Sequence, residues 1–270
     1  MSSYSTFEYD KEFITPKITW GVQHLILITV GIFAIQLILD PVLAALLPAY
    51  TQPSTTPGEL LAHWFGFQPG NFLRGHIWKP FTYMFLHGGM MHLFFNMLWL
   101  YIFGPHVERT LGTRQFYRFY IFCGALGVMA NYLVLINGIE PSVIGASGAA
   151  VGVLVASAMI DPDRQLFMIG LPFPINVRAL VFFVVFLNVI TAFASNTNTS
   201  VATHFGGMGA AFLYMHFRPQ WTRWNRARKE NALQKPKSKS KSKSKSKKLK
   251  DTIGEQVDNI LRFKDDEFKE

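Results

Sequence analysis

The chain contains six apolar runs, and each is long enough, or nearly so, to cross a lipid bilayer as a helix. A helix needs about 20 mainly apolar residues to span the hydrocarbon core. Half of the 270 residues are apolar, and 25 of them are Phe. This pattern predicts an all-α membrane protein with a bundle of six transmembrane helices. The runs are expected near residues 20–47, 80–103, 116–136, 144–160, 179–194 and 201–217.

The connection between the first two runs, residues 48–79, is unusual for a loop. It contains Pro and Gly together with aromatic residues such as Trp64 and Trp78. It is too apolar for a disordered linker and too interrupted for a span, and Trp is favoured at the membrane surface. We therefore expect a structured loop that lies in the membrane interface between helices 1 and 2.

The positions of Lys and Arg predict the orientation of the chain. If the N-terminus is cytoplasmic, every inner connection contains Lys or Arg, whereas the outer connections 137–143 and 195–200 contain neither. This distribution follows the positive-inside rule and, with an even number of spans, places both termini in the cytoplasm. Residues 1–18 are acidic rather than signal-like, so the first span is expected to act as an uncleaved insertion signal. We predict a multi-pass protein of a prokaryotic cell (inner) membrane.

The net charge of the chain resides in its tail. Residues 218–270 contain 17 Lys and Arg against 8 Asp and Glu, which equals the whole net charge of +9. This argues against nucleic-acid binding by the apolar part and favours anionic lipid headgroups, which attract each basic residue by about 1 kcal/mol. The predicted organisation begins with a cytoplasmic N-terminal segment (1–18) and a membrane domain (19–217). A basic, Lys-Ser-rich disordered linker (218–250) and a short amphipathic helix (251–270) follow.

Ser147 is the first candidate for chemistry, because a polar side chain in a span is costly and therefore suggests a function. It lies in the sequence Gly145-Ala-Ser-Gly148, at the start of the fourth run. Helix packing is a competing explanation, since Gly148, Gly152 and Ala156 recur every four residues as a small-residue stripe.

His204 is the second candidate and lies in the sixth run. Gly207 and Ala211 follow it at spacings that put small residues on the same helix face. If the two stripes pack together, Ser147 Oγ is expected about 2.6–3.2 Å from His204, within reach of a general base. The alternative role for His204 is an interhelical hydrogen bond. The apolar core of runs four to six contains no Asp or Glu to orient the histidine, which favours a Ser-His dyad over a triad.

His92 and Asn96 are four residues apart and share a face of the second helix. With the backbone N–H of Ser147 they can donate hydrogen bonds to an oxyanion, and each such donor is worth about 2.7–4 kcal/mol. An interhelical hydrogen bond is again the alternative. A metal site of His87, His92 and His204 is disfavoured, because the chain has no His-Glu-x-x-His sequence and only one Cys. We predict no cofactor and no metal.

Taken together, these residues resemble the rhomboid family of intramembrane serine proteases. The resemblance covers about residues 20–217, and the motifs occur in the family's order and spacing. The motifs are Trp78-Lys79, His87 with His92-x-x-x-Asn96, Gly104-x-x-x-Glu108-x-x-x-Gly112, Gly145-Ala-Ser-Gly148 and His204-Phe-Gly-Gly207. Within the third motif, Glu108 is interpreted as a structural hydrogen-bond acceptor.

The resemblance implies a six-helix bundle and a protease that cleaves membrane proteins in or near a span. It implies that Ser147 is the nucleophile and His204 the general base, with His92 and Asn96 as oxyanion donors. It further implies a water-filled cavity open to the non-cytoplasmic side, with 195–200 as a cap. Such enzymes favour a locally weak helix, which is sensible because a helical peptide bond is held in its own hydrogen-bond ladder.

Three residues depart from the family pattern. Val151 replaces the aromatic residue that stacks on the catalytic histidine, Ala211 replaces a glycine, and Lys79 stands where Arg is common. None of these changes removes a chemical group from the dyad. The alternative function is a non-catalytic rhomboid-like protein that binds membrane proteins. A small transporter or channel is less well supported, because the polar residues gather towards one side of the bilayer.

Overall fold

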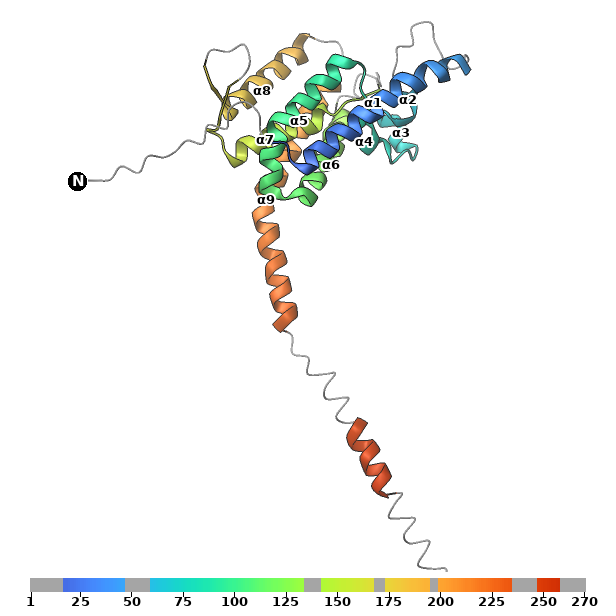
Figure 1. Cartoon of the computed structure of the whole chain (residues 1–270), viewed down its shortest axis with the longest axis vertical. Helices are drawn as coiled ribbons and strands as arrows, with labels where there is room; N and C mark the ends of the chain where they lie inside the picture. Colours follow the sequence, from blue (N-terminus) through green and yellow to red (C-terminus); the bar gives the residue numbers. More distant parts are fainter. Residues whose placement is uncertain are drawn as a thin grey trace, which may run out of the picture. The chain divides into compact units, whose positions relative to one another are not determined.

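The computed structural model describes residues 17–46, 59–133, 142–167, 173–194, 199–234 and 247–257, and these residues are mostly helical (Figure 1). The chain divides into two compact units, Met1–Phe217 and Arg218–Glu270. Most of the predicted cap, the Lys-Ser repeat and the last residues of the tail lie outside the described residues. The long helices are α1 (Trp20–Leu46), α5 (Met90–Leu111), α6 (Thr113–Met129), α7 (Ser147–Ile160), α8 (Val177–Ala194) and α9 (Thr199–Gln234).

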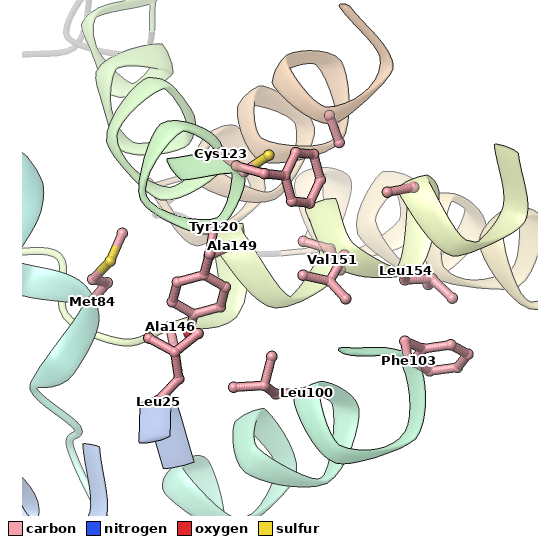
Figure 2. Close-up of a cluster of buried hydrophobic side chains, with 14 of the residues drawn as sticks. Leu25, Met84, Leu100, Phe103, Tyr120, Cys123, Ala146, Ala149, Val151 and Leu154 are labelled. Atoms are coloured by element: carbon pink, nitrogen blue, oxygen red, sulfur yellow. The ribbon is translucent and has the colours of Figure 1, made fainter. Parts of the chain in front are cut away.

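Helix α7 is the centre of the first unit and packs against α5, α6 and α8. Its sequence, SGAAVGVLVASAMI, consists almost entirely of small and aliphatic residues, so it can be buried on every side. Most of its residues are buried. Figure 2 shows side chains from the surrounding elements beside this helix, among them Leu25, Leu100, Phe103 and Cys123.

Among the described helices, one segment is long and apolar enough to cross a membrane by length and composition, Trp20–Leu43. Two shorter helical segments are also apolar, Ser147–Ile160 and Val177–Phe193. Many large apolar side chains on the outside of the first unit are exposed, for example Phe182 and Phe193 on α8. An exposed apolar surface of this kind is typical of a protein that interacts with lipid.

Glu108 ties the end of α5 to the start of α1. Its carboxylate accepts hydrogen bonds from the backbone N–H groups of Gly21 and Val22, both at 2.9 Å, and from the hydroxyls of Thr19 and Thr113. It therefore caps the first turn of α1, whose N–H groups have no partner within the helix. A Cβ on Gly21 would lie 2.8 Å from this carboxylate, so any other residue there would push the Glu108 side chain out of its present position. The interpretation of Glu108 as a structural acceptor is confirmed.

The described part of the 48–79 connection is folded into short helices. These are α2 (Glu59–Phe65), α3 (Pro69–Leu73) and α4 (Lys79–Thr82), and the 3₁₀ turn η2 (Tyr83–Phe85) follows directly. Residues 47–58 lie outside the described part. The carbonyl groups at the C-terminus of α2 have no partners within the helix. They accept hydrogen bonds from three side chains in and beside α4. The Trp78 side chain donates to the Trp64 carbonyl, the Lys79 side chain to the His63 carbonyl and the Thr82 hydroxyl to the Phe65 carbonyl.

Lys79 is the buried member of this set. Its side chain is 1% exposed, and Nζ donates to the His63 carbonyl at 2.7 Å. Burial lowers the pKa of this ammonium group. Its position at the C-terminal end of α2 favours a positive charge, because the helix dipole is negative there.

The connection from α7 to α8 contains a short two-stranded ribbon, in which β1 (Gln165–Leu166) pairs antiparallel with β2 (Ile175–Asn176). An exposed ion pair between Asp163 and Arg178, at 3.0 Å, closes the base of the ribbon. Elsewhere in the chain, the short 3₁₀ element η3 (Ala130–Leu133) follows α6.

The tail differs from the prediction. Helix α9 continues to Gln234, and residues 247–257 are also helical. The prediction of a disordered linker over 218–250 is therefore wrong for 218–234 and for the last residues of that range. The reason is compositional, because 218–234 is rich in Arg, Lys, Ala, Leu and Gln, which are good helix formers.

We expect Glu108→Gln to destabilise the protein, because a glutamine side chain presents an N–H group to donors that need an acceptor. Hydrogen bonds to a charged group are worth about 1.5–3 kcal/mol, which corresponds to a Tm lower by about 3–12 °C for a domain of this size. Thermal unfolding in detergent measures the effect. Glu255→Gln, at an exposed position, is the control, and an equal loss in both variants would contradict the capping role.

Candidate active site

The segment that leads into Ser147 is held at successive residues. Val143 forms two backbone hydrogen bonds with Phe67, at 2.9 and 3.0 Å, and the N–H of Gly145 donates to the Tyr83 carbonyl at 3.0 Å. The next N–H, that of Ala146, points to Nε2 of His87 at 3.5 Å. The start of α7 is therefore fixed against the α3 and η2 region before the serine is reached.

Gly145 brings this segment into contact with the α5 side chains. Its φ of +117° is a conformation that other residues rarely adopt. A Cβ at Gly145 would lie 2.6 Å from Cε1 of His92 and 3.6 Å from Nδ2 of Asn96. The structure thus places His92 and Asn96 against the backbone two residues before Ser147.

Asn96 is positioned by His87. The Nδ2 atom of Asn96 lies 3.0 Å from Nε2 of His87, and the His87 backbone is held in turn by Gln36, whose amide exchanges two hydrogen bonds with it. Because an amide nitrogen only donates, Nε2 of His87 is the acceptor in this pair. The second N–H of Asn96 remains able to donate to another group. The rings of His87 and His92 lie 5.1 Å apart.

Ser147 is the first residue of α7. The N–H groups in the first turn of a helix have no acceptor within the helix, and the helix dipole makes this end positive. A negative oxygen near Ser147 is therefore favoured by the backbone itself. His92 and Asn96 lie beside the same turn, so the arrangement can surround an oxyanion with donors.

Helices α7 and α9 touch through their glycines. A Cβ on Gly207 would lie 2.1 Å from the carbonyl oxygen of Gly148, and a Cβ on Gly148 would lie 2.8 Å from Cγ2 of Thr203. Gly127 of α6 also packs against Gly207, where an added Cβ would lie 3.1 Å from the Gly207 backbone nitrogen. The predicted contact between the two small-residue stripes is confirmed. It brings the neighbours of Ser147 against the neighbours of His204.

The structure does not contain the predicted hydrogen bond between Ser147 and His204. Within the described residues, the hydrogen bond of the His204 ring is made by Nδ1, which lies 2.6 Å from Oδ1 of Asn188 on α8. Hydrogen bonds between a nucleophile and its base are often long in the absence of substrate and shorten when substrate binds. The two side chains are on adjoining helix turns but are not hydrogen bonded to each other.

Asn188 is the residue that the sequence interpretation missed. Asp and Glu are the expected partners of a catalytic histidine in a triad, whereas the partner of His204 here is a neutral amide. The available signal was an Asn within an otherwise apolar run, because a polar side chain in a span requires an explanation. Asn188 is buried, with 8% of its surface exposed.

Two of the departures from the family pattern can be located. Val151 is buried in the core and Ala211 is fully buried. Val151 offers no ring, and within the described part of the chain the His204 ring makes no aromatic contact. Among the described residues no group of three or more His, Cys, Asp or Glu could hold a metal ion.

Comparison with known proteins identifies the class of this helical protein. The Rhomboid domain family matches residues 74–220, which is more than half of the chain. The chain therefore belongs to the rhomboid family. Membership makes it an integral membrane protein.

Individual relatives are similar over about half of the chain. The putative rhomboid protease YdcA of Bacillus subtilis is 29% identical over 139 residues, covering 52% of this chain and 66% of that protein. The rhomboid protease GluP of Bacillus subtilis is 30% identical over 161 residues, covering 59% of this chain and 29% of that protein. RHOMBOID-like protein 5 of Arabidopsis thaliana is 31% identical over 150 residues, covering 54% of this chain and 47% of that protein. The match thus spans less than two thirds of each of these relatives.

We expect Gly207→Ala to separate α7 from α9, because its new methyl group would overlap the Gly148 carbonyl. Overpacking of this kind costs about 1–3 kcal/mol, so thermal stability in detergent should fall. Gly209→Ala on the same helix meets nothing within 4 Å. That control should be neutral or slightly stabilising, since Ala is the better helix former. Equal stability of the two variants would contradict the close contact.

Proposed function

We propose that the protein is an intramembrane serine endopeptidase that cleaves membrane proteins in or near a span by a Ser-His dyad. The observation that supports this best is the contact of Gly148 with Gly207, made while Gly145 lies against His92 and Asn96. These contacts bring the Ser147 hydroxyl and the His204 imidazole together from α7 and α9. The two side-chain donors of α5, His92 and Asn96, lie beside the same first turn of α7. Membership of a family that includes proteins named as rhomboid proteases supports the same function.

In the proposed reaction, Ser147 Oγ attacks the carbonyl carbon of the scissile peptide bond as His204 accepts its proton. The carbonyl oxygen becomes an oxyanion, which accepts hydrogen bonds from the Ser147 N–H, His92 and Asn96. His204 then donates the proton to the leaving amine, and an acyl-enzyme remains on Ser147. Water, activated by the same histidine, hydrolyses that ester and regenerates the serine.

The proposed membrane topology follows the described helices. We assign the six spans to α1, α5, α6, α7, α8 and the first part of α9, with both termini in the cytoplasm of a prokaryotic cell. Residues 19–217 form the membrane domain in this proposal, and the α2–α4 region lies in the interface. The basic residues after 217 interact with anionic headgroups.

A non-catalytic membrane-protein binder is the second candidate. One observation favours it, namely that the Ser147 and His204 side chains are not hydrogen bonded in the structure. A binder would use the same polar site to recognise a membrane protein without cleaving it. The two candidates predict different results for the same substitutions.

We expect the wild-type protein to cleave a single-span model substrate in detergent or liposomes, and Ser147→Ala and His204→Ala each to abolish cleavage. Ser157→Ala is the control on the same helix, because Ser157 is a second serine of α7 that is buried and lies about three turns from Ser147. It should retain full activity. Cleavage by the Ser147→Ala protein at the wild-type rate would exclude the serine mechanism, and binding without cleavage by the wild type would favour the binder.

We expect His92→Ala and Asn96→Ala each to lower kcat by about 10²–10³-fold, because each removes one donor to the oxyanion. The KM should change little, since these donors act mainly on the transition state. Steady-state kinetics with the same substrate separates the two constants. A rise in KM with an unchanged kcat would assign these side chains to substrate binding instead.

A further inference from the structure

Asn188 of α8 is bound to His204 in a way that fixes which atom donates. Its Nδ2 lies 2.8 Å from the carbonyl oxygen of Val184, one turn earlier in the same helix. A carbonyl oxygen only accepts, so Nδ2 must face Val184, and Oδ1 must face the histidine.

The orientation of Asn188 determines the tautomer of His204. Because Oδ1 can only accept, the hydrogen bond of 2.6 Å to Nδ1 of His204 requires a proton on Nδ1. In a neutral imidazole the other nitrogen, Nε2, then has the free lone pair. This is the form that a general base needs to take a proton from a serine hydroxyl. Serine and cysteine proteases generally orient their histidine with a third side chain, which can be an asparagine.

The surroundings of His204 explain why an amide is needed there. Val151 occupies the place where a family aromatic would stack on the ring, and within the described residues no other ring contacts His204. Asn188 is buried on α8, whereas Ser147 and His204 come from α7 and α9. The hydrogen bond therefore ties a third helix to the histidine.

We infer that Asn188 is a positioning residue for catalysis, which holds His204 in the Nδ1–H tautomer with Nε2 available to Ser147. This inference rests on the proposed protease function and adds to it the third side chain of the site. Asn188 need not touch substrate. It acts through the histidine, so its loss should slow the chemical step and leave substrate binding intact.

The test replaces Asn188 by a residue of similar size with no acceptor. Asn188→Leu should lower kcat by about 10–100-fold, the effect of losing one hydrogen bond to a histidine that is positively charged in the transition state, with KM unchanged. The rate at which a fluorophosphonate probe labels Ser147 should fall by the same factor, because labelling reports activation of the serine without a peptide substrate. Thermal stability should not fall, since Leu is apolar and fills a similar volume.

Rescue by a conservative variant separates positioning from packing. Asn188→Asp keeps an oxygen acceptor at the same place and should retain activity within a few fold of the wild type. Thr191→Val, one turn further along α8 at an exposed position, is the control and should behave as wild type. If Asn188→Leu does not fold, Asn188→Ala removes the same acceptor without adding bulk and should show the same loss in kcat and labelling.

The outcomes distinguish this inference from the function on which it rests. Wild-type activity that is lost in Ser147→Ala but unchanged in Asn188→Leu would overturn the inference alone. Equal losses in the Leu and Asp variants would also overturn it, because an acceptor would then not be the feature that matters. Absence of cleavage and of Ser147 labelling in the wild type would overturn the proposed function itself.

Discussion

The contact between Gly148 and Gly207 is the constraint on which the rest of the site depends. Two helices can approach until their backbones touch only where neither has a side chain in the way. Here the approach is so close that a single methyl group would overlap a carbonyl oxygen. The residues on either side of this contact, Ser147 and His204, are brought to adjoining turns as a result. Apolar packing around α7 then keeps the helices in this register.

The polar groups of the bundle fall into two sets with different surroundings. The first set is structural, and its members satisfy backbone groups that the fold leaves open. Glu108 caps the start of α1, Lys79 binds the end of α2, and Gln36 holds the backbone of His87. The second set surrounds the start of α7, where Asn96 is buried, Ser147 and His204 are half-buried and His92 is exposed. One N–H of Asn96 and the N–H groups in the first turn of α7 stay available as donors, so this second set is the one that suggests a reaction.

Much of the architecture could be predicted from the sequence, because length and apolarity of a segment are local properties. The runs near 20–47, 116–136 and 144–160 correspond to α1, α6 and α7, and the stripe of glycines indicated which faces meet. The helical segment after 217 was not predicted, because its composition was considered together with the Lys-Ser repeat. The site residues were proposed by chemistry and resemblance, and their roles remain a proposal. Asn188 could not be paired with His204 from sequence alone, because that contact depends on how α8 is rotated against α9, which no spacing in the chain encodes.

The most direct measurement is an experimental structure of the protein after reaction with a fluorophosphonate, whose phosphorus becomes bonded to the nucleophile. Phosphorus is expected on Ser147 Oγ, with a phosphonyl oxygen within hydrogen-bond distance of the Ser147 N–H, His92 and Asn96. Nε2 of His204 is expected to face the adduct while Nδ1 stays on Asn188. An adduct on another residue, or one whose oxygen points away from α5, would contradict the proposed site.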